Sequence, residues 1–333
     1  MLAAVFEGEG RLSLQDRPRP EPVAGEVLVE VEACGICGSD LAILDLPPRH
    51  PATPGIIIGH EMVGRVVALG EGVASIESGT RVIIDPDPKC GTCPSCKGGR
   101  PATCERIVAL GVYRDGALAR HVTAPASACH PIAEEVPAHV AALAEPLACV
   151  VNGTNKAAIR PSESAVVFGG GAIGCLFAAV LAAGGARTVV VVEPNPVRAP
   201  VASAVGATHV LSPGEWTAQR GAILPGGADV VVDAVGSVLP EALDAAAMSA
   251  RIVVFGMNVN ARPAVHQVEI TEKGVTIFGS YITAFTFPQA IRLLESGSLN
   301  VEPLVAAVLP LERVADAIAM LKSGAATKVV VTP

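Results

Sequence analysis

Two short stretches near the start of the chain carry side chains that could bind a metal ion. Cys37 lies in the run Val31–Asp40, and His60 is followed directly by Glu61. A thiol and an imidazole together suit a borderline-soft ion such as zinc. Ser39, just beyond the thiol, could place a hydroxyl near an oxygen bound to that metal. These residue types predict a reactive metal centre.

A second cluster holds four thiols with two, two and seven residues between them: Cys90, Cys93, Cys96 and Cys104. Four thiolates so close together can complete a tetrahedral zinc shell that leaves no position for water. Such a site is structural, because the ion folds a loop that is too short to have a core of its own. Thiolates also hold iron–sulfur clusters, so this alternative stays open.

A glycine-rich turn in the middle of the chain matches the pattern G-x-G-x-x-G, and its residues are Gly169, Gly171, Ala172, Ile173 and Gly174. The turn follows an expected strand, 165–168, and opens an expected helix, 172–183, which is the context that a dinucleotide requires. Gly169 permits the tight turn, Gly171 lets the pyrophosphate approach the backbone, and Gly174 lets helix and strand pack closely. The helix N-terminus then faces the phosphates. A glycine-rich turn without a nucleotide is the alternative.

Glu193 ends the next expected strand, 188–192. A carboxylate at this place accepts hydrogen bonds from both ribose hydroxyls and repels a 2′-phosphate. This favours NAD over NADP, although the nearby Arg198 leaves NADP open.

The pattern of expected elements changes along the chain. Residues 1 to about 150 carry brief strands with frequent Gly and Pro, which favours a compact, mostly β domain. Strands rich in β-branched residues then alternate with helices, which indicates a parallel sheet covered on both faces. The further segments expected there are a helix at 138–158 interrupted by Pro146, helices at 197–205 and 239–248, and strands at 229–233, 251–255 and 275–278. Towards the C-terminus we expect a helix at 287–296 and a strand at 328–331, whose packing the pattern does not predict.

Composition excludes several classes of protein. The net charge of -8, with no basic run, argues against a nucleic-acid surface. Residues 1–7 lack the features of a signal peptide, so we expect a cytoplasmic protein. Nine cysteines, an odd number, suit metal binding in a reducing compartment better than disulfides. The uncharged run 165–186 is long enough to span a bilayer, but its glycines lie where turns are expected, which favours strand, turn and helix over a membrane span.

The chain resembles the zinc-containing medium-chain dehydrogenase/reductase superfamily in the combination and order of four motifs: Cys37, the Gly59–Glu61 triplet, the four-cysteine cluster and the Gly169–Gly174 turn. The resemblance spans nearly the whole chain. It implies an α/β protein with a GroES-like, mostly β catalytic domain and a Rossmann domain built on a doubly wound parallel sheet. The implied domains are residues 1–150 and 284–333 with a structural zinc lobe at 88–106, and residues 151–283 for the Rossmann domain. A homodimer or homotetramer is implied as well.

Glu145 falls where the ethanol-oxidising branch of this family has cysteine and where the polyol and threonine dehydrogenase branch has glutamate. The chain therefore resembles sorbitol, threonine and cyclitol-type dehydrogenases, in which Glu61 or Glu145 ligates zinc, directly or through water, and the two exchange. Cys149 is a rival ligand that we interpret as a buried packing residue. Relatives often carry a proton-relaying histidine where this chain has Ala42, so Ser39 or another group such as His50 or Glu145 must take that role.

The resemblance implies a zinc-dependent NAD(H) alcohol dehydrogenase or ketone reductase with one catalytic and one structural zinc per chain. Zinc would make the substrate alkoxide accessible, Ser39 would accept the proton, and the nicotinamide would take the hydride. The expected substrate is a small polar secondary alcohol: a polyol, a cyclitol or aminocyclitol, or a threonine-like compound. Polar residues expected near the cleft, Arg114, Asp115, Glu145 and Asn152, weakly favour such a substrate. Two alternatives are a zinc-free quinone reductase and a catalytically silent sensor or scaffold that binds zinc and NAD.

Overall fold

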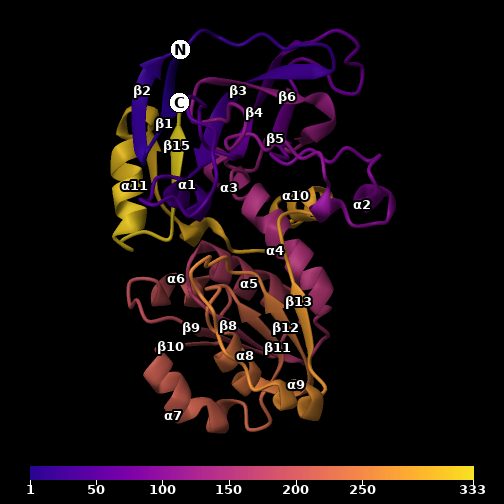
Figure 1. Cartoon of the computed structure of the whole chain (residues 1–333), viewed down its shortest axis with the longest axis vertical. Coiled ribbons are helices and arrows are strands. Elements are labelled where there is room, and N and C mark those ends of the chain that lie inside the picture. Colours follow the sequence, from indigo (N-terminus) through magenta and orange to yellow (C-terminus); the bar gives the residue numbers. More distant parts are fainter. The chain divides into compact units, whose positions relative to one another are not determined.

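The computed structural model describes all residues, 1–333, and divides them into two compact units (Figure 1). Unit 1 contains Met1–Glu145, Thr283–Ser296 and Val305–Pro333; unit 2 contains Pro146–Ile282 and Gly297–Leu304. The expected boundaries differ from these at 146–150 and at 297–304, which both lie in unit 2, and at Thr283, which lies in unit 1. The second difference has a packing reason, since Asn300 donates a hydrogen bond to the carbonyl of Ala204 at 2.9 Å.

Unit 1 is built around a seven-stranded sheet with the order β14-β15-β3-β4-β5-β7, and β6 also pairs with β3. A two-stranded sheet of β1 and β2 completes its strands. The bounds are β1 (Leu2–Gly8), β2 (Arg11–Asp16), β3 (Glu26–Gly35), β4 (Glu61–Leu69), β5 (Arg81–Ile84), β6 (His121–Pro125), β7 (Cys129–Pro131), β14 (Val305–Pro310) and β15 (Lys328–Thr332).

Short helices connect these strands and cover the aliphatic core of unit 1. They are α1 (Gly38–Ile43), α2 (Pro94–Lys97), α3 (Ala138–Ala141), α10 (Phe287–Glu295) and α11 (Val314–Lys322), with 3-10 turns η1 (Pro101–Thr103), η2 (Ala126–Ala128) and η4 (Leu311–Arg313). The core they enclose is mainly Ala, Val, Ile and Leu, as the low aromatic content requires.

The C-terminal strand joins the two ends of the chain within unit 1. Strand β15 runs antiparallel to β3, with Val330 opposite Gly35 and Val331 opposite Cys34. Ile36 extends this pairing, because its N–H donates to the carbonyl of Val329 at 3.0 Å. The start of β15 therefore lies beside the end of β3, a long-range contact that the sequence pattern does not reveal.

Unit 2 holds a six-stranded parallel sheet with the order β10-β9-β8-β11-β12-β13. Its inner strands are buried on both faces, which explains their continuous β-branched sequence. The strands are β8 (Ser164–Phe168), β9 (Thr188–Val192), β10 (His209–Leu211), β11 (Ala228–Asp233), β12 (Ala246–Val254) and β13 (Thr276–Gly279). The helices are α5 (Ala172–Ala183), α6 (Ala199–Ala204), α7 (Pro213–Ile223), α8 (Leu239–Ala245) and α9 (Gln267–Lys273), with η3 (Glu302–Leu304); α4 (Ala144–Ala157) contains the boundary between the units. The expected α/β fold is confirmed.

Two helix predictions were wrong in detail. Pro146 does not interrupt a helix: it lies in the first turn of α4, where its missing N–H has no intrahelical partner to lose, and the break from α3 comes earlier, at 142–143. Met248 does not end helix α8, because Ala246 already pairs with Ala228 as the start of β12. The uncharged run 165–186 forms strand β8, the glycine turn and α5, and none of the helices has the length and apolarity to cross a membrane.

Candidate metal centre and nucleotide-binding turn

The antiparallel pairing of β3 with β4 brings the predicted metal ligands together. Gly35 at the end of β3 lies opposite Glu61 at the start of β4. Cys37 follows β3 and His60 precedes β4, so both lie at the same end of this strand pair. The ligand atoms of Cys37, His60 and Glu61 all lie within 4.8 Å of one another. A thiolate, an imidazole and a carboxylate form a donor set that fits zinc.

The imidazole of His60 lies between a hydroxyl and a carboxylate. Its Nε2 is 3.3 Å from Ser39 Oγ, and its Nδ1 is 3.5 Å from Asp40 Oδ1. Burial opposes protonation of His60, but attraction by Asp40 and Cys37 outweighs it and holds the pKa of the imidazole well above its usual value. A divalent cation in place of that proton would meet the same negative charges, so the surroundings fit a metal.

Asp40 was not among the predicted site residues. It is fully buried at the N-terminus of α1, where its Oδ2 accepts a 2.9 Å hydrogen bond from the N–H of Cys37. Its Oδ1 and the Nδ1 of His60 have no other hydrogen-bond partner. The acidic residue in the first helical turn after Cys37 is a sequence signal that could have revealed this role.

Glu61 is held by Lys328, a second residue that the sequence analysis did not identify. Lys328 Nζ donates to both carboxylate oxygens of Glu61, at 2.7 and 2.6 Å, and to the carbonyl of Ile36 at 3.0 Å. Both side chains are buried. Gly35 makes the arrangement sterically possible, because a Cβ at that position would overlap Oε2 of Glu61. No local pattern marks Lys328, since it is distant in sequence from the other residues.

The remaining predicted residues near this centre have different positions. Glu145 is buried in the first turn of α4 and lies outside the group of three ligand atoms, although its charge acts on Lys328. His50 has its Nδ1 2.8 Å from the carbonyl of Pro51.

Three of the polar residues expected near the cleft form ion pairs or hydrogen bonds within the fold. Arg114 pairs with Glu26 at 2.8 Å, and Asp115 accepts from the N–H of Ile57 at 2.9 Å. Asn152 likewise donates to the carbonyl of Ile282 at 2.8 Å. Because these three groups are engaged within the fold, they give no support for a hydroxyl-rich substrate, and of the four expected residues only Glu145 still could.

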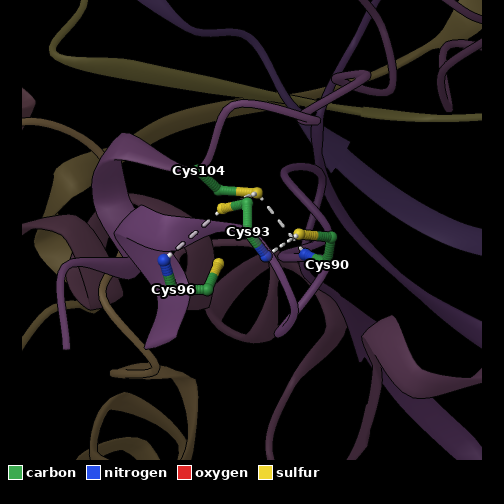
Figure 2. Close-up of side chains that lie close together, drawn as sticks. All are labelled: Cys90, Cys93, Cys96 and Cys104. Atoms are coloured by element: carbon green, nitrogen blue, oxygen red, sulfur yellow. Dashed lines mark hydrogen bonds between the residues drawn. The ribbon is translucent and has the colours of Figure 1, made fainter. Parts of the chain in front are cut away.

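The four cysteines of the second cluster lie together (Figure 2), and all nine cysteines of the chain are free thiols. Backbone N–H groups point at the sulfurs: Cys93 donates to Cys90 Sγ at 3.3 Å, and Cys96 donates to Cys93 Sγ at 3.4 Å. Hydrogen bonds from Thr92 and Cys93 lower the pKa of Cys90 to about 6. The pKa of Cys93 is lowered as well, whereas burial raises the pKa of Cys96 to about 12. The four sulfurs and the N–H groups aimed at them fit a metal that binds thiolates.

The glycine-rich turn has the geometry of a phosphate cradle. Gly169 has φ +98°, which favours glycine, and a Cβ on Gly174 would overlap the carbonyl of Gly169. Gly171 is the N-cap of α5, and a Cβ there would meet only Arg198 Nη1, at 3.9 Å. The space beside Gly171 is therefore open at a helix N-terminus, where an anion is stabilised. Ala172 and Ile173 form the first turn of that helix.

Glu193 is fixed beside this turn. Its carboxylate accepts from the N–H of Gly170 at 2.6 Å and from the N–H of Asn195 at 2.8 Å. Arg198 Nη1 lies 3.5 Å from the same carboxylate. An acidic and a basic side chain thus flank the position at which the sequence pattern expects the ribose.

Comparison with known proteins identifies the family of the chain. Residues 23–134 match the alcohol dehydrogenase GroES-like domain family, and residues 172–296 match the zinc-binding dehydrogenase family. D-altritol 5-dehydrogenase of Agrobacterium fabrum is 35% identical over 318 residues, which is 93% of either chain. The chain belongs to the zinc-containing medium-chain dehydrogenase/reductase superfamily. The predicted resemblance is confirmed.

Further proteins are similar to the chain over almost their whole length. The starvation-sensing protein RspB of Escherichia coli K12 is 33% identical over 97% of this chain and 96% of its own. A zinc-binding dehydrogenase of Sinorhizobium meliloti 1021, solved bound to NADP, has a TM-score of 0.94 at 30% identity and covers 100% of this chain and 99% of its own. The rspB alcohol dehydrogenase of Escherichia coli CFT073, solved with NADH, has a TM-score of 0.93 at 32% identity, with coverage of 100% and 99%.

Proposed function

We propose that this medium-chain dehydrogenase/reductase oxidises a small polar secondary alcohol, or reduces the corresponding ketone, with zinc and NAD(H). The observation that carries the proposal is the convergence of Cys37, His60 and Glu61 beside the hydroxyl of Ser39. The open glycine turn in the same chain supplies the place for the dinucleotide.

Cys37 and His60, with Glu61 or Glu145, would hold the catalytic zinc, and the four-cysteine cluster would hold a structural zinc. When bound, the catalytic zinc would act as a Lewis acid on the alcohol oxygen, and the nicotinamide would accept the hydride. The chain's own residues position these groups. Asp40 orients the imidazole of His60, because its carboxylate faces Nδ1 and leaves Nε2 for the metal.

Ser39 is the residue we propose to handle the proton of the alcohol. Its hydroxyl lies 3.3 Å from His60 Nε2, next to the proposed metal ligands. A hydroxyl both accepts and donates, so it can take a proton and pass one on. Ala42 offers no such group, and His50 lies against the carbonyl of Pro51.

The fixed carboxylate of Glu193 supports NAD as the preferred cofactor, because a buried negative charge repels a 2′-phosphate. Arg198 partly neutralises that charge, and the solved relatives carry NADP in one case and NADH in the other. We therefore propose that NADP is used less efficiently than NAD.

The substrate class is supported by the D-altritol 5-dehydrogenase of Agrobacterium fabrum, whose name describes a polyol as substrate. A catalytically silent sensor is the second candidate, favoured by the starvation-sensing name of RspB and by alanine at position 42. A homodimer or homotetramer stays an expectation from the family.

A panel of polyols, cyclitols and threonine, followed by NADH absorbance with NADP run in parallel, tests the proposal. We expect reduction of NAD by at least one polyol, and loss of the signal after chelation of zinc. A protein that binds two zinc ions and NAD yet is inert with every alcohol and ketone would contradict it and favour the sensor.

A further inference from the structure

A buried ion pair lies at the proposed metal centre and has no role in the function described above. Lys328 opens strand β15, and its ammonium contacts both oxygens of Glu61. Glu61 has no solvent exposure, and the Lys328 side chain is only 4% exposed. Burial of two charges costs desolvation free energy, so the presence of the lysine at this site calls for a functional explanation.

The position of Lys328 follows from the pairing of three strands. Ile36 and Val329 pair through their backbone, and Lys328 precedes that pair. Gly35 lies opposite Glu61 and leaves the space that the carboxylate occupies. Lys328 has one further acceptor, the carbonyl of Ile36. The pairing of β15 with β3 and of β3 with β4 therefore places the ammonium against the Glu61 carboxylate.

The contacts of Lys328 place its ammonium against an anionic group. Its Nζ lies 2.7 and 2.6 Å from the two carboxylate oxygens of Glu61, so lysine and glutamate form an ion pair. Lys328 thus brings a positive charge to the edge of the proposed metal ligands. A divalent metal and this ammonium attract the same carboxylate and repel each other.

We propose that Lys328 is a positioning residue that competes with the metal ion for the Glu61 carboxylate and so keeps Glu61 a labile ligand. The inference rests on the proposed metal centre. Each carboxylate oxygen has two lone pairs, so Glu61 can face the metal while it holds the ammonium, but it donates less charge than a free carboxylate. Without Lys328, Glu61 would bind the metal permanently, and a permanent anionic ligand would make the ion a weaker Lewis acid.

The test compares Lys328→Met with two matched variants. Lys328→Met keeps the length of the side chain and removes its charge, Lys328→Arg keeps the charge, and the double variant Glu61→Gln/Lys328→Met removes both charges. Each full-length protein is loaded with Co²⁺, and the spectrum of Cys37→Ser is subtracted to isolate the reactive site from the four-cysteine cluster. Affinity for Zn²⁺ is measured by competition with a chelator.

We expect Lys328→Met to change the Cys37-dependent cobalt spectrum, to bind Zn²⁺ roughly tenfold more tightly or better, and to turn over substrate roughly tenfold more slowly. The Arg variant should show the wild-type spectrum, and the double variant should keep a Cys37-dependent band but lack the change seen in Lys328→Met. A Lys328→Met protein with the wild-type spectrum and affinity, or with weaker zinc binding, would overturn the inference. If that variant does not fold, the double variant decides, because loss of its Cys37-dependent band would mean that Glu61 is a permanent ligand.

The experiment separates this inference from the proposed function. Absence of any Cys37-dependent cobalt band in the wild-type protein would reject the metal centre itself. A normal wild-type band that is indifferent to Lys328→Met would reject only the role of the lysine.

Discussion

One carboxylate contacts the backbone of one proposed zinc ligand and faces the side chain of the other. Asp40 Oδ1 lies 3.5 Å from Nδ1 of His60, and both atoms are buried without another hydrogen-bond partner. Oδ2 of Asp40 accepts from the N–H of Cys37 at 2.9 Å. A histidine that binds zinc usually donates its other ring N–H to such a carboxylate, which fixes its tautomer and its orientation.

Replacing Asp40 with asparagine should therefore lower zinc affinity and activity on the order of 10- to 100-fold, because the imidazole loses its charged partner. Zinc retained after dialysis against graded chelator measures the effect. Asp45→Asn is the matched control, since Asp45 pairs with Arg49 away from the ligands, and it should behave as wild type. Wild-type zinc retention in Asp40→Asn would contradict the assignment.

Removal of one thiol from the second cluster should destabilise residues 88–106. Cys104→Ser is expected to hold one zinc ion per chain instead of two and to be cleaved by protease within this loop, because the loop depends on the metal for its fold. Cys129→Ser, a buried cysteine outside the cluster, is the control. Metal analysis and limited proteolysis provide the readouts, and two ions in Cys104→Ser would argue against a structural zinc site.

Cofactor preference should respond to the charges that flank the glycine turn. Glu193→Gln keeps one acceptor oxygen for the N–H groups of Gly170 and Asn195 and removes the charge that repels a 2′-phosphate. The ratio of kcat/KM for NADP over NAD should rise about tenfold or more, equivalent to ~1.4 kcal/mol. Arg198→Ala should lower the same ratio. If both variants kept the wild-type ratio of kcat/KM for NADP over NAD, neither side chain would contact the ribose.

The stability of unit 1 should depend on pH through Asp85. Burial raises the pKa of this carboxyl from 3.8 to about 6, although Lys89 opposes the shift. The folded state thus holds the proton more tightly than the unfolded chain, so the contribution of Asp85 to stability is present below about pH 3.8 and is lost as the pH rises through about 6.

Asp85→Asn removes that titration. The free energy of unfolding of the variant, relative to wild type, should therefore rise as the pH increases from about 4 to about 6. Denaturant unfolding at several pH values measures it. Parallel pH profiles for the two proteins would contradict the burial effect.

Local sequence signals predicted the helices and strands whose ends are marked by particular residues. Helix α5 and strand β9 begin and end at the expected residues, because each is a uniform run bounded by Gly or charged residues. Helix α7 was not predicted, although Ser212 and Glu215 form a capping box that the sequence displays. Helix α11 was not expected either.

The candidate site was predictable only where its residues lie in local motifs. Cys37, His60 and the glycine turn stand in recognisable patterns, and Asp40 could have been inferred from its place in the first turn of a helix. Lys328 could not, because its contact with Glu61 depends on the pairing of β15 with β3. The order of strands in a sheet is a tertiary property, and periodicity carries no information about it.

The most direct test of the account is the activity and metal content of Cys37→Ser, measured with the best polyol of the substrate panel. We predict one zinc ion per chain instead of two, retained NAD binding, and NADH formation reduced to background, because His60 and Glu61 alone would hold the ion poorly. Full turnover in Cys37→Ser would contradict a catalytic metal at this site, and with it the assignment as a zinc-dependent alcohol dehydrogenase.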